Sequence, residues 1–548
     1  MCANVGLVFL VLVSVTSIEG QEGERIRLKL QNGEIEGRVA KTVDEGKTYY
    51  SFQGIPYAKP PLENLRFEAP QPAENWTGIR DATKLASICI EMYGERGNED
   101  CLYLNVYTPS LDKSLPVIIW LPGGAFIFVI TSFSLNGADF FMDEEVIVVT
   151  VNYRLGVFGF ISTEDDVIPG NYGLKDQVMA INWVHENIAA FGGDPNKVTI
   201  MGQSAGAVSA SYLGMVPHLK GKIHGIIQQS GSCLNPFSLG RYQRTGAFVV
   251  STEMGLQTSD SSQIVEYLRK ADAVSLRNAS RTTYIDLVLG MGPFTGILYT
   301  PGLEPRNSKD PLLTEMPYEQ LKKGHFTKIP RMIGLNSMEG LYMIDTEFGA
   351  MPSLYNNYDQ NIRRYIPVDM NTRNEHVGKL IRRYYMNDRP FLSNLTNALH
   401  FGTDDQYVRG ILKDARLVSK YSTTYLYQFS YEGKLGNPNR EMRGVGHGEE
   451  VEYLFHNEDH GQISDEDRKI RKKLVRLWSN FAKHSNPTPN KEKILDNQIW
   501  LPINPRRGHT NYMDIRSTLV PSLNPHQKDV DFWDHLYSTY GNPPFDTY

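Results

Sequence analysis

Short apolar, β-branched runs alternate with helical patterns over several hundred residues, and this alternation constrains the fold more than any other feature. The runs of strand length lie at residues 116–121, 146–152, 198–201, 225–229, 329–335 and 423–429. Strands that are apolar on both faces suit the centre of a sheet covered by helices on each side. Residues 176–191 place apolar side chains at helical spacing and end at a glycine pair. The pattern predicts an α/β fold with a large, mostly parallel central sheet flanked by helices.

The N-terminus differs from the rest of the chain. Residues 5–18 are nearly all apolar, a stretch too short for a membrane span of about 20 residues and typical of a secretory signal. We therefore expect a signal peptide at residues 1–20 and a secreted, extracellular protein; a buried N-terminal strand is the alternative interpretation. No repeat or Pro/Gly/Ser linker divides the remainder, which predicts one domain over residues 21–548.

Charge and composition exclude several classes of function. The 548 residues carry 56 Lys and Arg against 62 Asp and Glu, a formal charge of −6. A mildly acidic chain without a basic run lacks the electrostatic footprint of a nucleic-acid binder. No second long apolar segment follows the N-terminus, so we expect no membrane anchor. No Cys/His spacing resembles a zinc site, and we expect no metal.

The expected secretion bears on the state of the cysteines and on three glycosylation sequons. Cys89 and Cys101 can close a short loop in an oxidising compartment, which leaves Cys233 unpaired. The Asn-x-Ser/Thr triplets begin at Asn75, Asn278 and Asn394, and we expect glycosylation at each.

A Gly-x-Ser-x-Gly motif follows the run at 198–201 directly. Gly202 and Gly206 flank Ser204, and a run of small residues typical of a tightly packed helix comes next. Between a strand and a helix this motif is a nucleophile elbow, a turn too tight for side chains at the two glycine positions. It predicts Ser204 as a nucleophile; a plain Gly/Ser turn is the alternative.

A serine nucleophile needs donors for the oxyanion of a tetrahedral intermediate. The run ending at Leu121 leads into Gly123, Gly124 and Ala125, where small residues let backbone N–H groups face the reaction centre, joined by the N–H of Ala205. A glycine turn between two strands would look the same.

The general base and its acid come from two further loops. Among 13 histidines only His447 lies between two glycines, in a loop shortly after the run at 423–429. Glu339 follows the run at 329–335 and can orient that imidazole. Taken alone, Glu339 would be a solvated loop residue, but the chain order Ser204, Glu339, His447 is the nucleophile–acid–base order of α/β hydrolases.

With these residues assembled, the chain resembles the type-B carboxylesterase/cholinesterase family, most of all secreted insect carboxylesterases. The resemblance runs from about Ile26 to about Trp533. It rests on six segments in fixed order, at residues 52–58, 65–67, 99–105, 152–156, 173–177 and 191–195.

The resemblance implies a single α/β-hydrolase domain and a triad of Ser204, Glu339 and His447. It implies an oxyanion hole of the N–H groups of Gly124, Ala125 and Ala205, with Gly123 shaping the loop, and a disulfide between Cys89 and Cys101. It implies no cofactor.

Three departures from the family pattern bear on the substrate. Pro122 stands where most members carry His or Tyr. Gln203 replaces the usual Glu, a pattern that resembles esterases acting on juvenile hormone. The Cys89–Cys101 loop contains no Trp, so the cation–π contact by which cholinesterases hold choline is missing. We therefore expect neutral esters as substrates and choline esters as poor ones.

The function predicted is that of a secreted serine carboxylesterase that hydrolyses small neutral esters as a monomer or weak dimer. A non-catalytic, cholinesterase-like adhesion protein is the alternative from another class, and specialisation for juvenile hormone or pheromone esters is the alternative within it. A serine carboxypeptidase would share the fold, but the six segments do not match that branch.

Overall fold

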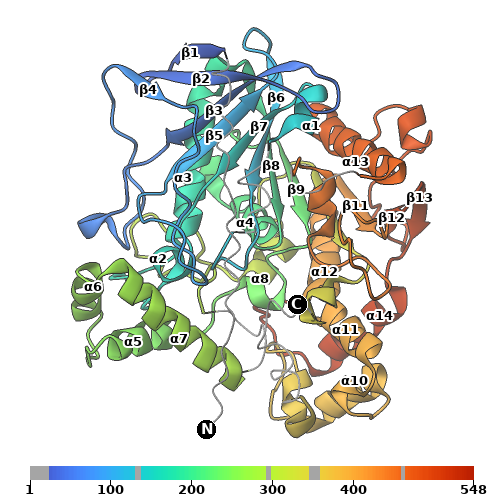
Figure 1. Cartoon of the computed structure of the whole chain (residues 1–548). Coiled ribbons are helices and arrows are strands. Elements are labelled where there is room, and N and C mark those ends of the chain that lie inside the picture. The colour runs from blue at the N-terminus through green and yellow to red at the C-terminus, as the bar shows by residue number, and fades with distance from the viewer. Residues whose placement is uncertain (1–23, 130–136, 292–297, 345–357, 458–462) are drawn as a thin grey trace, which may run out of the picture.

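One large sheet runs through the computed structural model, which describes residues 24–129, 137–291, 298–344, 358–457 and 463–548 (Figure 1). The strands are β1 (Arg25–Lys29), β2 (Glu34–Lys41), β3 (Thr48–Pro56), β4 (Ile79–Asp81), β5 (Tyr103–Thr108), β6 (Leu115–Leu121), β7 (Ile147–Val151), β8 (Gly193–Gln203), β9 (Gly225–Gln229), β10 (Arg331–Asn336), β11 (Thr424–Phe429), β12 (Asn511–Ile515) and β13 (Leu519–Leu523). Their order across the sheet is β1-β2-β3-β5-β7-β6-β8-β9-β10-β11-β12-β13, with β4 paired to β2.

The centre of this sheet is parallel and its ends are antiparallel. Every neighbouring pair from β7 through β6 and on to β12 is parallel. The pairs β1–β2, β2–β3, β3–β5, β5–β7 and β12–β13 are antiparallel. The prediction of a large, mostly parallel sheet is confirmed, and the six predicted runs are β6, β7, β8, β9, β10 and β11, with ends shifted by a few residues.

Helices connect the strands and cover the sheet. They are α1 (Asp139–Asp143), α2 (Gly156–Phe160), α3 (Tyr172–Asn187), α4 (Ala205–Leu213), α5 (Gln243–Glu253), α6 (Ser261–Arg269), α7 (Ala273–Met291), α8 (Pro317–Lys323), α10 (Glu375–Met386), α11 (Leu395–Thr403), α12 (Arg409–Val418), α13 (Asp465–His484) and α14 (Gln527–Tyr540). The helix expected at 176–191 is α3 followed by a 3₁₀ turn at Ile188–Phe191, and Gly192 ends it with a φ of 76°.

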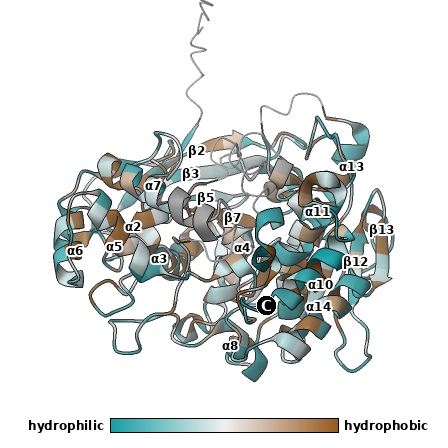
Figure 2. Cartoon of the chain, turned by 90° about the horizontal axis from the view of Figure 1, so that it is seen from below, coloured by the Kyte–Doolittle hydropathy of each residue, from teal (hydrophilic) through white to brown (hydrophobic). Residues whose placement is uncertain are grey.

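Alternate residues of the central strands pack on opposite faces of the sheet, as period-2 geometry requires. In β6, Val117 and Ile119 belong to the hydrophobic core shared with α3 and α4, whereas Ile118 and Trp120 belong to the core shared with α13. Both faces are therefore buried, which is why the strand runs are continuously apolar. Hydrophilic residues predominate on outlying helices such as α6 and α8 (Figure 2).

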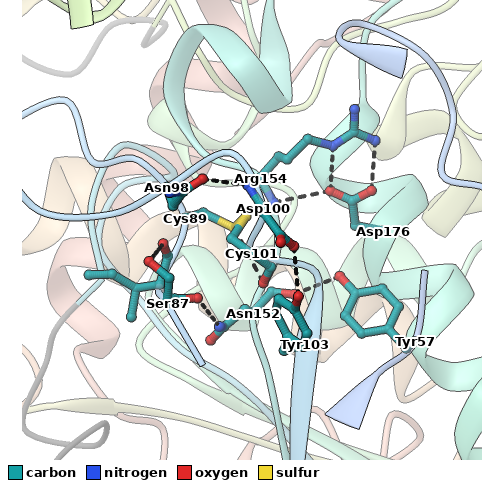
Figure 3. Close-up of a disulfide and its surroundings, with 11 residues drawn as sticks. Tyr57, Ser87, Cys89, Asn98, Asp100, Cys101, Tyr103, Asn152, Arg154 and Asp176 are labelled. Carbon is teal, nitrogen blue, oxygen red and sulfur yellow. Dashed lines mark hydrogen bonds and ion pairs between the residues drawn. A yellow bond between two sulfur atoms is a disulfide. The ribbon is translucent and has the colours of Figure 1, made fainter. Parts of the chain in front are cut away.

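Segments that carry the family resemblance pair with one another through buried ions. Arg66 makes a bidentate ion pair with Glu99, with both N···O distances 2.6 Å. Arg154 does the same with Asp176 at 2.7 and 2.8 Å, beside the disulfide (Figure 3). Removing one partner of a buried ion pair leaves the other charge unpaired, at a cost of about 3–5 kcal/mol. These segments, which lie far apart in the sequence, therefore depend on one another for stability.

The structure tests only part of the predictions about secretion and membrane anchoring. The predicted signal peptide, residues 1–20, lies outside the described residues. Within the described parts of the chain, no helix combines the length and the apolarity that crossing a bilayer requires.

Candidate active site

Ser204 occupies a strained turn between β8 and α4. Its φ and ψ are 55° and −122°, in a region that a residue with a side chain seldom adopts. Its backbone N–H donates to the carbonyl of Gln229, the last residue of β9, at 2.8 Å. The residue is only 7% exposed. The turn thus fixes the hydroxyl at the N-terminus of α4, above the carboxyl edge of the parallel strands, where sites in such folds lie.

The two glycines of this motif are required by close backbone contacts. A Cβ at Gly202 would lie 2.2 Å from the carbonyl carbon of Gly206. A Cβ at Gly206 would lie 1.9 Å from the carbonyl oxygen of Leu121, at the end of β6. Real Cβ atoms do not approach backbone this closely, so the tight elbow depends on both glycines, as its sequence predicted.

Glu339 and His447 come together from two loops at the same edge. Glu339 follows β10, is fully buried, and lies with Oε2 2.7 Å from Nδ1 of His447. Its other oxygen accepts the backbone N–H of Asn336 at 2.6 Å. Because an ionised carboxylate only accepts hydrogen bonds, Nδ1 carries a proton and donates a hydrogen bond to Glu339. In the neutral ring, Nε2 then offers its lone pair.

The Nε2 atom of His447 faces Gln203, the neighbour of Ser204. The side-chain nitrogen of Gln203 lies 3.2 Å from Nε2. No hydrogen bond joins Ser204 to His447 within the described residues. Glu339 and His447 are therefore in direct contact, and Ser204 is linked to them through its chain neighbour Gln203, whose amide lies on the second ring nitrogen. Catalytic hydrogen bonds are often long in a ligand-free enzyme and tighten when substrate binds.

The predicted oxyanion loop lies against Ser204. A Cβ at Gly123 would fall 2.9 Å from the Cβ of Ser204. Gly124 and Ala125 have φ values of 122° and 52°, which turn the chain tightly after β6. Among the described residues, nothing accepts the N–H groups of Gly124, Ala125 or Ala205. Such unused donors beside a nucleophile suit a developing oxyanion.

A second buried acid, Glu450, escaped the sequence interpretation. It accepts hydrogen bonds from the side-chain amides of Asn336, at 2.5 Å, and of Gln229, at 3.1 Å. Burial, together with the charge of Glu339, raises the pKa of Glu450 to about 7. Nothing in the sequence distinguishes it from the neighbouring Glu449 and Glu452, so sequence reasoning did not find it.

Two aromatic rings and a cavity complete the surroundings of His447. The ring centroids of Tyr407 and Tyr342 lie 4.7 and 5.9 Å from that of the imidazole. A cavity of about 170 Å³ opens beside His447 and is lined in part by Gln203 and Glu449. These tyrosines follow no motif, so sequence reasoning did not find them.

The loop closed by Cys89 and Cys101 supports the far end of the oxyanion segment. The two cysteines form a disulfide. Within this loop, the buried carboxylate of Glu91 accepts the backbone N–H of Val129 at 2.9 Å. The N–H of Met92 donates to the carbonyl of Ile127 at 2.7 Å. The disulfide loop thus holds residues 127–129, which follow the oxyanion turn.

The sequence also predicts three glycosylation sites and an unpaired cysteine. Asn75, Asn278 and Asn394 are exposed, which leaves glycosylation at each a prediction. Cys233 is buried and has no disulfide partner among the described residues.

Comparisons with known proteins agree with this arrangement. The model of the carboxylesterase family matches residues 24–533. Juvenile hormone esterase of Tribolium castaneum is 34% identical over 81% of each chain, and esterase FE4 of Myzus persicae is 33% identical over 87% of this chain and 86% of its own.

A solved structure is also similar. The crystal structure of juvenile hormone esterase from Manduca sexta, with OTFP covalently attached, superposes with a TM-score of 0.83 at 27% identity, over 94% of this chain and all of that one. The matching segments, the α/β-hydrolase sheet and the family model, which spans nearly the whole described chain, lead to one conclusion: the chain belongs to the carboxylesterase family.

Proposed function

We propose that this protein is a secreted serine carboxylesterase that hydrolyses neutral carboxylic esters through an acyl-enzyme on Ser204. The observation that carries the proposal is the 2.7 Å contact between Glu339 and Nδ1 of His447. The other ring nitrogen of His447 contacts Gln203, the residue directly before Ser204. The contact with Glu339 leaves Nε2 as the only ring nitrogen able to accept a proton. Membership in a family of esterases supports the same reaction class.

The reaction proceeds in two acyl transfers. In the first, the Ser204 oxygen bonds to the ester carbonyl carbon while His447 Nε2 takes the hydroxyl proton. The oxyanion accepts hydrogen bonds from the N–H groups of Gly124, Ala125 and Ala205. The intermediate collapses when the C–O bond to the alcohol breaks and Nε2 returns its proton to the leaving oxygen.

In the second transfer, water replaces the alcohol. His447 Nε2 takes one water proton as the oxygen attacks the acyl carbon, and the Ser204 oxygen leaves with the proton back from Nε2. Glu339 holds the ring in one tautomer and stabilises the imidazolium in both steps. The sum is ester plus water giving acid plus alcohol.

Replacing the nucleophile tests this mechanism. Ser204→Ala is expected to lower kcat for an aryl ester by at least about 10⁴-fold, because the covalent route is lost. The wild type should give a burst of alcohol and a covalent organophosphate adduct on Ser204. The matched control is Ser262→Ala, which removes an exposed hydroxyl on α6 and should keep full activity. Full esterase activity in the Ser204 variant would refute the mechanism.

A narrower function has its own support. Two similar proteins are named juvenile hormone esterases. Gln203 adds to this support, because its place before Ser204 carries the sequence resemblance to such esterases. Juvenile hormone is a neutral ester, so the same chemistry applies. Hydrolysis of juvenile hormone by the wild type, with a kcat/KM well above that for simple aryl esters, would favour this specialisation; the reverse order would favour a general carboxylesterase.

A further inference from the structure

The Gln203 side chain is enclosed at the point where it meets His447. Gln203 is 1% exposed. A Cβ at Gly123 would fall 2.4 Å from its Oε1, and a Cβ at Gly448 would fall 3.4 Å from its Nε2. The amide therefore lies in a slot between two glycines, one in the oxyanion loop and one directly after the histidine. A side chain at Gly123 would expel it.

The amide can serve only one protonation state of the ring in this orientation. Its N–H donates to His447 Nε2 across 3.2 Å, which requires the lone pair of the neutral imidazole. An imidazolium would direct its own N–H at the amide nitrogen, and the contact would become repulsive. A hydrogen bond made to the neutral form of a group disfavours its charged form.

Four acids and one base also surround His447. Glu339 binds Nδ1, and the buried Glu450 lies close to both. Glu449 lines the cavity on the Gly448 side, where Arg440 pairs with it, and Glu452 lines the same cavity. The remaining neighbours, Tyr342 and Tyr407, contact the imidazole with their aromatic rings. An imidazolium has no lone pair on Nε2 and cannot act as a general base, so the group that Nε2 meets bears on the proposed reaction.

We propose that Gln203 is a positioning residue for His447: its N–H donates to Nε2, holds the imidazole in place and favours the neutral ring that can accept a proton. The role rests on the proposed function, because it matters only if His447 takes the serine proton. When substrate binds, the Ser204 hydroxyl replaces the Gln203 amide as the hydrogen-bond donor to the lone pair of Nε2. A glutamate in the same slot would instead accept from Nε2 and favour the imidazolium.

Titration of the imidazole by NMR tests the proposal without relying on turnover. The His447 ring signal is assigned by its loss in His447→Asn. In Gln203→Glu the titration midpoint should rise by more than one pH unit, a more than tenfold gain in proton affinity, because a carboxylate replaces the donor. In Gln203→Leu, which keeps the bulk and loses the donor, it should rise by less.

The control for added charge is Gln263→Glu, an exposed position on α6, where the midpoint should not move. An unchanged midpoint in Gln203→Glu would overturn the proposal. If that variant fails to fold, as judged by circular dichroism, Gln203→Leu decides: a midpoint unchanged or lowered there is equally fatal.

Kinetics give a second readout. In Gln203→Glu the acid limb of kcat/KM should move to higher pH together with the NMR midpoint, while the burst on Ser204 is retained. A moved midpoint with full activity in Ser204→Ala would refute the proposed mechanism and leave the role of Gln203 in the ring's protonation intact. An unmoved midpoint with an inactive Ser204→Ala would do the reverse.

Discussion

His447 and His400 both lie beside buried carboxylates, and they differ in which ring nitrogens those carboxylates meet. His447 gives Nδ1 to a single acid, Glu339, and turns Nε2 to the uncharged amide of Gln203. His400, on α11, gives one nitrogen to two acids: its Nε2 lies 3.2 Å from Asp404 and 3.3 Å from Asp529.

The surroundings of His400 fix it as a cation. Burial alone would lower its pKa, but the hydrogen bonds to Asp404 and Asp529 outweigh burial and raise the pKa to about 10. Tyr385 donates to Asp404 and Tyr384 donates to Asp529, both at 2.8 Å, so the carboxylates are held in turn. The protonated ring ties α11 to α14.

The difference shows what separates a structural histidine from a candidate general base. A ring shared by two carboxylates keeps its proton at neutral pH and acts as a permanent positive link. A ring with one carboxylate on Nδ1 and a neutral donor on Nε2 is oriented and still has a lone pair to offer. Proximity to acids alone does not identify a catalytic histidine.

Removing each imidazole gives the largest contrast. His447→Ala is expected to lower kcat by about 10⁴-fold or more, because the general base is lost. It also leaves the buried Glu339 without its hydrogen bond, at a cost of about 1–3 kcal/mol of stability. His400→Ala should keep kcat within about twofold and lower the free energy of unfolding by about 1–2 kcal/mol, because two carboxylates lose their shared cation. Ester hydrolysis and urea denaturation measure the two effects. Strong loss of activity in His400→Ala, in a folded protein, would break the comparison.

The pH dependence of stability should sharpen it. The pKa of His400 rises from an unfolded value near 6.5 to about 10 when the chain folds. Its stabilisation is therefore complete below about pH 6.5 and is lost as the pH rises toward 10. Because the side chain is 41% exposed, solvent screening limits the effect to about 1 kcal/mol.

The measurement is the difference in unfolding free energy between the wild type and His400→Gln at several pH values. Taking the difference cancels the other groups that titrate. It should be largest near pH 6 and should shrink by pH 10; a constant difference would mean that His400 is not held as a cation.

Tyr384→Phe probes the same cluster with the smallest expected effect. The phenol donates to Asp529 in a partly buried position, and its loss should cost about 0.5–1.5 kcal/mol of stability. Activity should not change, because the ring stays in place. Thermal or urea denaturation detects the loss. A change in kcat would connect the His400 cluster to the esterase site and contradict their separation.

The sequence predicted the candidate site best where the functional residues lie in short local motifs. Ser204 and its glycines, the loop at Gly123 and the turn at Glu339 each follow a recognisable strand, so the parallel sheet brings them to one edge. The contacts between segments were beyond reach. The amide of Gln203 on His447 and the carboxylate of Glu450 behind Glu339 depend on side-chain packing across more than a hundred residues, which no spacing encodes.

The state of the cysteines has a practical consequence. Cys89 and Cys101 are bonded to each other, and burial raises the pKa of the Cys233 thiol, which keeps it protonated and out of contact with solvent. The described part of the folded chain therefore presents no reactive thiol to a maleimide dye. A single cysteine introduced at an exposed position such as Gln263 would be the sole labelling site in that part of the chain.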